Sequence, residues 1–377
     1  MRILQVGTFP YPSTQGSQVY VKGIIEGLVE LGHHVDLLCY GHGVGALDDP
    51  RENVNVHRTP TLFGYSNMRA GPDFVKPILD ILMSLKMRNL RPDIIHVHNY
   101  EAPIVAKIAK IIAKHLRGVP MVYSAHTLMG EELETYFEKD CTRRMAKVFG
   151  YGLDRFIPKM SSHAIVLRKQ SIPTLQSLGC KLVSEVSPSV DVKEFLPLEE
   201  LRKRCPSVLQ EGKWIVYAGN PDTYQNIEVL MSALECVPDI GLVMVSDSDT
   251  TDWTRKNGRV VHIQTNDFEV VQHYIANADL AVIPRMKCTG FPIKLLNYLM
   301  LGCVTLVSEG SMVDMVGAIA FPNGNVEVLV EKIEYWMSHH NERQLLGSSA
   351  ISGVVEGYSH RVQAEELVAI YVSLLKT

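Results

Sequence analysis

The stretch KCTGFPIKLLNYLMLG, residues 287–302, has a loop that leads into a helix, and such a junction can bind an anion. Pro292 suits the first position of a helix, because its missing N–H would have no partner there. Gly290 lets a ligand come close to the backbone. Gly290, Lys294 and Asn297 follow one another at helical spacing, so they share one face at the helix entrance.

Two further cations flank this loop. Arg285 and Lys287 precede the helix, and with Lys294 they place three cations around its first turn. We expect this group to hold a diphosphate, because the helix dipole and the point charges act together. An ordinary amphipathic helix with Lys294 in solvent is the alternative interpretation. The other side of the helix is predicted to lie in the core through Leu295, Leu296, Leu299 and Met300.

A second candidate site is the loop of residues 8–21, which ends at Gln15 and Gly16 just before a predicted helix. The first N–H groups of a helix lack partners, so this loop is either an anion site or a plain connection. It does not have the pattern G-x-G-x-x-G, and a dinucleotide fingerprint is therefore absent.

Polar residues also follow two apolar strands, in HVHNYEA (residues 96–102) and YSAHT (residues 123–127). The carboxyl ends of parallel strands line ligand sites, so we expect these side chains near a substrate, although each histidine alone fits a buried structural role. His96 and His98 alternate along a strand and face the same side, but no third ligand is evident and no metal is predicted. The candidates here are His98, Asn99, Glu101 and His126.

Strand and helix patterns alternate along most of the chain, which predicts an α/β protein with two doubly wound, mostly parallel sheets. The proline-punctuated segment 182–200 lacks periodicity and is interpreted as a linker. We predict a first domain over residues 1–188 and a second over residues 189–359. A last helix within residues 360–377 is expected to pack back on the first domain.

The composition excludes several classes of protein. The chain has 377 residues, 46% of them hydrophobic, and no apolar run that approaches the roughly 20 residues of a membrane span. Seven cysteines without a C-x-x-C pair suggest reduced thiols in a cytoplasmic protein. Residues 76–181 carry 17 Lys+Arg against 9 Asp+Glu, so this segment is basic although the net charge is −4. It favours an anionic partner, or it reflects lysine-rich helix surfaces.

Four segments that cover nearly the whole chain resemble glycosyltransferase family 4, whose retaining enzymes have the GT-B fold of two facing Rossmann-like domains with a cleft between them. They are QGSQVYVKGIIEGLVELGHHVDLLCYG, EVSPSVDVKEFLP, YAGNPDTYQNIEVLMSAL and IANADLAVIPRMKCTGFPIKLLNYLMLGCVTLVS. The resemblance implies a nucleotide-sugar donor, commonly UDP- or GDP-linked, bound by the second domain without a metal or another cofactor. His126 matches the family's strand-end histidine near the transferred sugar, and we expect it to position that sugar.

The chain departs from the family at four donor contacts. The two glutamates of the family correspond to Thr289 and Asn297, and the Arg and Lys that clamp the diphosphate correspond to Asn220 and Gln225. Asn297 can still hydrogen-bond with a ribose, since an amide both donates and accepts.

Nearby groups can replace the contacts that these departures remove. We expect Arg285, Lys287 or Lys294 to replace the missing cations. The backbone amides of Gly290 and Phe291, with Thr289, are expected to contact the sugar in place of the first glutamate.

These features predict a retaining glycosyltransferase that moves a sugar from a nucleotide-diphosphate sugar to a glycan, lipid-linked or small-molecule acceptor. The departures leave an alternative, a catalytically weak glycosyltransferase-like binding protein or partner subunit. A GT-B epimerase or phosphorylase has only the fold in its favour.

The charge distribution along the chain also predicts binding partners. The basic residues 76–181 are expected near the inner face of an anionic membrane, and no nucleic acid is expected. The helix in residues 102–118 either lies on anionic lipid or is the outer face of a sheet-covering helix. Its cations are Lys107, Lys110, Lys114 and Arg117.

Overall fold

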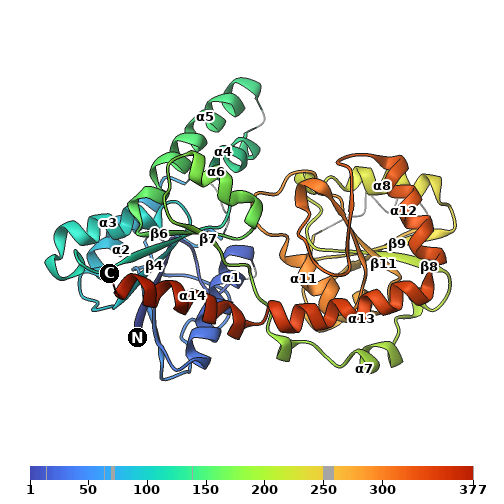
Figure 1. The fold of residues 1–377 in the computed structure, drawn as a ribbon, viewed down its shortest axis with the longest axis horizontal. Coiled ribbons are helices and arrows are strands. Elements are labelled where there is room, and N and C mark those ends of the chain that lie inside the picture. Colours follow the sequence, from blue (N-terminus) through green and yellow to red (C-terminus); the bar gives the residue numbers. More distant parts are fainter. Residues whose placement is uncertain (14, 63, 69–72, 138, 249–258, 377) are drawn as a thin grey trace. The chain divides into compact units, whose positions relative to one another are not determined.

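The computed structural model describes residues 1–13, 15–62, 64–68, 73–137, 139–248 and 259–376. The chain forms two compact units, each with its own parallel sheet (Figure 1). Unit 1 comprises Met1–Ser189, Thr289–Phe291 and His360–Thr377, and unit 2 comprises Val190–Cys288 and Pro292–Ser359. The α/β fold with two doubly wound sheets is therefore confirmed.

Unit 1 is built on a 7-stranded sheet in the order β3-β2-β1-β4-β5-β6-β7, and every pair in it is parallel. Two of these strands were not predicted. β3 has polar residues at most positions, and the three-residue β7 lies within the segment interpreted as a linker, so neither shows a clear periodicity. The strands are β1 (Arg2–Gly7), β2 (His34–Cys39), β3 (Val54–Arg58), β4 (Ile94–His98), β5 (Met121–Ala125), β6 (His163–Val166) and β7 (Val183–Glu185).

Helices cover both faces of this sheet, as its buried strands require. The last helix, α14, lies along α1 (Figure 1). Gly27 of α1 makes this close approach possible, since a Cβ there would stand 2.0 Å from the carbonyl oxygen of His360. The helices of unit 1 are α1 (Gly16–Glu30), α2 (Lys76–Met87), α3 (Ala102–Ile112), α4 (Met129–Glu132), α5 (Asp140–Phe156), α6 (Ile172–Ser177) and α14 (His360–Leu375).

The two faces of the unit 1 sheet differ in polarity, because successive side chains of a strand point to opposite faces. Leu4 and Val6 of β1 belong to an apolar core with Leu79 and Met83 of α2. The alternate positions face α1 and α14 and include buried polar side chains. These are Gln5, His96, His98 and Ser124.

Unit 2 repeats the plan with a 6-stranded sheet in the order β10-β9-β8-β11-β12-β13, also parallel throughout. Its strands are β8 (Lys213–Ala218), β9 (Ile240–Ser246), β10 (Val260–Gln264), β11 (Leu280–Ile283), β12 (Thr305–Ser308) and β13 (Ala318–Phe321). Its helices are α7 (Leu198–Lys203), α8 (Ile227–Cys236), α10 (Phe268–Asn277), α11 (Ile293–Met300), α12 (Val326–Ser338) and α13 (His340–Gly357). No helix in the described part of the chain is long and apolar enough to cross a bilayer.

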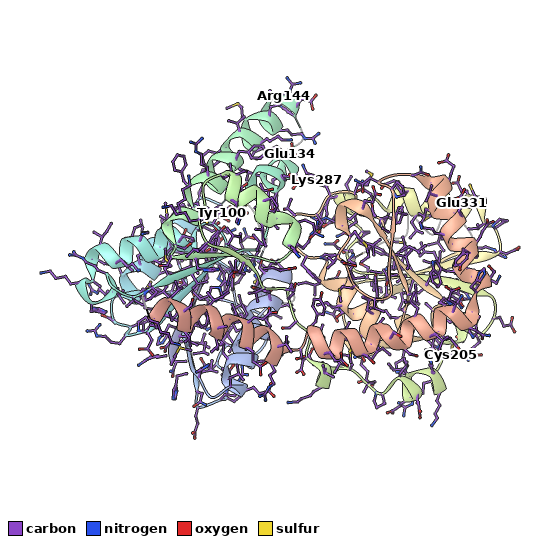
Figure 2. All side chains as sticks on the ribbon, in the orientation of Figure 1. Tyr100, Glu134, Arg144, Cys205, Lys287 and Glu331 are labelled. Atoms are coloured by element: carbon purple, nitrogen blue, oxygen red, sulfur yellow. The ribbon has the colours of Figure 1, made fainter. Side chains whose placement is uncertain are left out.

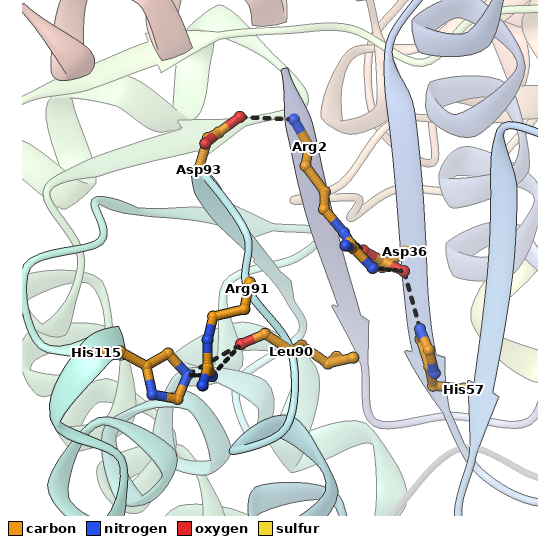
Figure 3. A network of polar contacts seen from close by, with 7 residues as sticks. All are labelled: Arg2, Asp36, His57, Leu90, Arg91, Asp93 and His115. Atoms are coloured by element: carbon orange, nitrogen blue, oxygen red, sulfur yellow. Dashed lines mark hydrogen bonds and ion pairs between the residues drawn. The ribbon is translucent and has the colours of Figure 1, made fainter.

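A polar network ties together the edge of the unit 1 sheet (Figure 3). The Asp36 carboxylate of β2 accepts from Arg2 Nε of β1 at 2.5 Å and from His57 Nε2 of β3 at 2.9 Å. Burial alone would raise the pKa of Asp36, but the hydrogen bonds and charges of His57 and Arg2 outweigh it and hold the pKa at about 2. The ionised carboxylate therefore stabilises the fold.

Replacing Asp36 by asparagine is expected to lower the free energy of unfolding by about 1–2 kcal/mol at pH 7, since Arg2 is half-exposed and its attraction is screened. A depressed pKa contributes stability above the unfolded value and loses it as the pH falls toward about 2. The difference between wild type and Asp36→Asn should thus shrink between pH 5 and pH 2 in urea unfolding. The exposed Glu52→Gln is the control, and a constant difference across this range would contradict the assignment.

Candidate functional site

Helix α11 carries Lys294 and Asn297 of the stretch KCTGFPIKLLNYLMLG. It begins at Ile293, so Pro292 is the residue before the helix and not its first helical position as predicted. Leu295, Leu296 and Leu299 are buried in the core. Lys294 and Asn297 are half-buried on the other side of the same helix.

Lys294 is the centre of a hydrogen-bonded network in unit 2. Its ammonium donates to the Tyr217 hydroxyl at 2.8 Å and to Gln225 Oε1 at 3.4 Å. Tyr217 donates in turn to the carbonyl oxygen of Asn220 at 2.7 Å, and Gln225 Nε2 donates to Asn220 Oδ1 at 3.0 Å. The structure thus brings together Lys294, Asn220 and Gln225, and it adds Tyr217, which the sequence did not single out.

The interpretation of Lys294 as a solvated surface residue does not hold. Its Nζ lies 4.2 Å from the centre of the Tyr217 ring. Burial, together with the nearby Arg285 guanidinium, lowers the pKa of Lys294 to about 7. Part of the population therefore carries a neutral amine at neutral pH, and this amine takes up a proton when an anion approaches it.

Arg285 belongs to the same site, whereas Lys287 stands at its edge. The Arg285 guanidinium lies 4.8 Å from the centre of the Tyr224 ring, and its Nε donates to the carbonyl oxygen of Lys287 at 2.8 Å. The Tyr224 hydroxyl in turn accepts from Asn220 Nδ2 at 3.0 Å. Lys287 itself is exposed. Two of the three predicted cations thus stand against the network, and the third is at the surface.

Thr289, Gly290 and Phe291 group with unit 1, unlike the residues of this network. The sequence analysis had predicted that they lie beside Lys294 and Asn297 at the entrance of one helix.

Backbone strain shapes the loop that carries Asn220 and Gln225. Gly219 has φ 127°, and a Cβ there would stand 3.1 Å from Lys294 Nζ. Asn226 has φ 55°, a left-handed conformation that costs of order 1 kcal/mol outside glycine. Its side-chain oxygen accepts from the Met286 amide at 3.1 Å, which ties this loop to the one before α11.

The network suits an anion better than a metal ion. The side chains of the network offer cations, amides and a hydroxyl, but no carboxylate, imidazole or thiolate. They belong to Lys294, Arg285, Asn220, Gln225 and Tyr217. Zinc sites are built from imidazole, thiolate and carboxylate ligands, and sites for hard cations usually include carboxylates. A cation beside amide donors is the arrangement that recognises phosphate oxygens.

Unit 1 contains a polar cavity of about 120 Å³ at the carboxyl ends of its strands. Gln15, Asn99, Glu101 and His126 all line it, so residues predicted from three separate segments meet at one place. Gln15 precedes α1, and its side-chain amide donates to the carbonyl oxygen of Met68 at 2.6 Å. Asn99 has φ 63°, a strained conformation that is typical of functional loops.

Glu101 contributes a carboxylate to this cavity. Its Oε2 accepts from the Thr8 hydroxyl at 3.3 Å, and burial raises the pKa of Glu101. The cavity is also lined by polar residues that the sequence did not reveal, because each lies on a helix whose pattern fits an ordinary surface. These are Gln18, Lys76 and Glu132.

Three histidines form a buried chain behind the cavity. His96 Nε2 lies 2.8 Å from Ser124 Oγ and its Nδ1 2.7 Å from the Tyr371 hydroxyl of α14. His98 Nδ1 lies 3.2 Å from His126 Nε2, and its Nε2 lies 2.7 Å from Gln5 Oε1. His96 and His98 do lie on one side of β4, as their alternation predicted.

The hydrogen bonds determine which nitrogen of each ring carries a proton. With the amide oxygen of Gln5 as its acceptor, His98 is protonated on Nε2, and its Nδ1 accepts from His126 Nε2. His126 Nδ1 is then an acceptor, and it is buried without a protein partner among the described residues. Burial lowers the pKa of His126 to about 3, so the ring is neutral at physiological pH.

Two predicted residues are absent from the lining of the cavity. His98 is fully buried and reaches the cavity only through its contact with His126. Gly16 is the first residue of α1 and supplies backbone only. The prediction that both face a ligand rested on their place at the ends of elements, which does not fix where a side chain points.

Two protein-family descriptions match the chain. A glycosyl transferase 4-like domain matches residues 15–169, and a glycosyl transferases group 1 domain matches residues 212–339. An uncharacterised glycosyltransferase of Methanocaldococcus jannaschii is 23% identical over 98% of this chain and 98% of its own.

Solved structures resemble the chain in fold over its whole length. Sucrose-phosphate synthase from Thermosynechococcus elongatus matches with a TM-score of 0.80 at 16% identity, over 100% of both chains. Anabaena HepE, solved in complex with UDP and glucose, matches with a TM-score of 0.72 at 14% identity, over 99% of this chain and 100% of its own. A UDP-forming α,α-trehalose-phosphate synthase from Burkholderia vietnamiensis matches with a TM-score of 0.70 at 12% identity, over 99% and 100%.

Proposed function

Since the chain belongs to the GT-B glycosyltransferases, which combine a glycosyl transferase 4-like domain with a group 1 domain, we propose that it transfers a sugar from a nucleotide-diphosphate sugar with retention of configuration. The acceptor that we propose is a glycan or a lipid-linked glycan. The observation that carries this proposal is the Lys294 network, a set of cations and amides with the chemistry of a diphosphate site.

The network compensates for the departures at Asn220 and Gln225. Gln225 stands where relatives have a cation, and Lys294 reaches it from α11 with Nζ 3.4 Å from Gln225 Oε1. A positive charge is therefore present beside the neutral residue, supplied by a different element. UDP in complex with Anabaena HepE supports a uridine-linked donor, and GDP-linked donors stay within the proposal.

The same cations suit the chemical step. When the bond between the sugar and the diphosphate breaks, the leaving diphosphate gains negative charge. In a retaining reaction the acceptor hydroxyl attacks from the same face and passes its proton to an oxygen of the departing phosphate. Lys294 and Arg285 are in place before the reaction, so they stabilise that charge without reorganisation. No metal ion is needed in this scheme.

His126 serves the proposed reaction as a neutral acceptor. His126 lines the unit 1 cavity, and its Nδ1 is buried without a partner among the described residues. In the proposed complex this nitrogen accepts a hydrogen bond from a sugar hydroxyl. The ring is held by His98 on one side and by the Tyr20 ring, whose centre lies 4.9 Å away. We assign it a role in positioning the sugar, since a group whose pKa is about 3 is a poor proton acceptor at neutral pH.

The basic segment 76–181 remains part of the proposal as the region that contacts an anionic membrane. Helix α3 is a less direct candidate than its sequence suggested. Lys110 Nζ donates to the carbonyl oxygen of Val119, and burial lowers its pKa to about 8. Arg117 donates to carbonyl oxygens at the end of the same helix. Two of the four cations therefore satisfy backbone groups.

A panel of donors tests the proposal. UDP-, GDP-, ADP- and TDP-linked sugars, added singly, are expected to raise the melting temperature with one base preferred. A donor at a hundredfold excess over its Kd adds about 2.7 kcal/mol of stability. The preferred donor should also release nucleoside diphosphate on addition of a glycan acceptor. Failure of every donor to stabilise the protein would overturn the proposal.

The absent glutamates favour one competing function. Thr289 and Asn297 lack the carboxylates of active relatives, so a nucleotide-sugar-binding protein without turnover is the second candidate. Stabilisation by a donor without release of nucleoside diphosphate in the presence of acceptors would support it over the transferase.

A further inference from the structure

We propose that the acceptor is carried on an apolar chain, and that a groove between α2 and α5 of unit 1 is the subsite for that chain. This inference rests on the proposed function, because it names the class of acceptor. It adds a binding site that lies outside the donor network and outside the polar cavity of unit 1.

The groove is large and mostly lined by carbon. Its volume is about 590 Å³, much larger than that of the polar cavity. One wall comes from α5 and the other from α2 and the segment before α5. The apolar residues that line it are Pro77, Leu133, Phe137, Met145, Ala146, Phe149 and Leu153.

The groove adjoins the polar cavity. Lys76, Tyr100 and Glu101 line both spaces, so one molecule can occupy the two together. Glu101, Asn99 and Gln15 offer carboxylate and amide groups that recognise sugar hydroxyls, whereas the groove offers only hydrophobic contact over most of its wall. The occupant that fits both is a hydroxyl-bearing head joined to an apolar chain.

The walls of the groove continue outside it as apolar surface. On α5, Met145, Val148 and Phe149 are 73%, 74% and 64% exposed, and Phe156 is 65% exposed. On α2, Ile78 and Ile81 are 50% and 54% exposed. Soluble surfaces seldom gather side chains of this kind, and an apolar surface of this kind marks an interaction site.

The charges beside this surface favour a lipid bilayer as the source of the chain. Arg144 and Arg155 lie next to the apolar stripe on the helical wheel of α5 and are exposed. Figure 2 shows Arg144 at the outer end of α5 and Tyr100 near the sheet. A helix with an apolar stripe and arginines along one border of it suits the interface of an anionic bilayer. The remainder of the chain then stays in the bilayer while its first carbons occupy the groove.

The test uses butyl, octyl and decyl β-glucoside below their micelle concentrations as probes, with binding measured by calorimetry. Each methylene group that enters the groove should tighten binding about fourfold, from the transfer energy of a buried methylene. Octyl glucoside is therefore expected to bind far more tightly than butyl glucoside.

Three exposed positions give matched variants. Met145 lines the groove, Val148 lies on α5 outside it, and Leu345 lies on α13 of unit 2, and they are 73%, 74% and 72% exposed. Met145→Glu is expected to remove most of the dependence on chain length, because its carboxylate would stand against the alkyl chain. Val148→Glu and Leu345→Glu should keep that dependence. All three substitutions are at the surface and should leave the melting temperature nearly unchanged.

The outcomes separate this inference from the proposed function. Glucoside binding requires neither donor nor turnover. If a donor stabilised the protein but glucoside affinity did not depend on the length of the alkyl chain, the groove would be rejected as a subsite and the proposed function would stand. An equal loss of chain-length dependence in Met145→Glu and Leu345→Glu would also overturn the assignment of the groove, because the probes would then be binding to exposed apolar surface in general. Chain-length dependence without donor binding would retain the groove and reject the transferase.

Discussion

Replacing Lys294 by methionine is expected to weaken the binding of nucleoside diphosphate by about 10–100-fold, the value of a charge-assisted hydrogen bond of about 1.5–3 kcal/mol. Methionine keeps the length and apolar contacts of the side chain, so the fold of α11 should persist. The measurement is calorimetric titration with UDP or GDP, whichever base the donor panel prefers. An affinity within threefold of wild type would reject Lys294 as a diphosphate ligand.

The same residue predicts a pH dependence. Because the pKa of Lys294 is lowered to about 7, its ammonium is fully charged only below that pH. Affinity for the diphosphate should therefore fall as the pH rises through 7, by roughly tenfold between pH 6 and pH 8. Binding near neutral pH should also take up a proton, visible as a buffer-dependent heat.

Lys294→Arg is the matched control for this effect. Arginine stays charged between pH 6 and pH 8. In this variant the affinity therefore changes with pH only through the titration of the ligand, and the contribution of residue 294 disappears. If the arginine variant kept the full loss of affinity at high pH, the effect would belong to another group.

The second large effect is expected at His126. Leucine at this position should lower the rate of nucleoside diphosphate release by about 100-fold, which is the usual loss when one preorganised hydrogen bond to the reacting group is removed. Asparagine can place its side-chain oxygen near the former Nδ1, so His126→Asn should retain more activity than His126→Leu. The readout is kcat with saturating donor, since a positioning role changes kcat more than donor KM.

The pH profile distinguishes positioning from proton transfer at His126. With a pKa of about 3, the ring is neutral across the working range, and the wild type should show no limb near pH 6.5 that depends on this residue. A limb there that vanished in His126→Leu would identify the imidazole as an acid or base and contradict its assignment.

Much of the fold was predictable because buried parallel strands leave long apolar runs and their helices leave a period of 3.6. The last helix, α14, was located in the same way. β7 was not predicted, since a strand of three residues is too short to show an alternation of apolar and polar side chains. The packing of α14 against α1 depends on Gly27, whose role is visible only when His360 is placed against it.

The candidate site was predictable where residue types were unusual and not where they were ordinary. Lys294 stood out as a cation at the entrance of a predicted helix, and Gln225 stood out by comparison with a family pattern. Tyr217, in contrast, is the fifth residue of an apolar strand, and nothing in the sequence distinguishes it from a core aromatic. The groove of unit 1 was equally hidden, because its walls come from separate segments that meet only in the folded chain.

The place of α14 affects the order in which the protein can fold. Unit 1 takes its first 189 residues from one part of the chain and α14 from another, and all of unit 2 is synthesised between them. While the ribosome completes unit 2, Gly27 of α1 has no helix against it and His96 lacks the Tyr371 hydroxyl. Unit 2 can close its own core first, although it begins later. The contact between His96 and Tyr371 is thus among the last features to form.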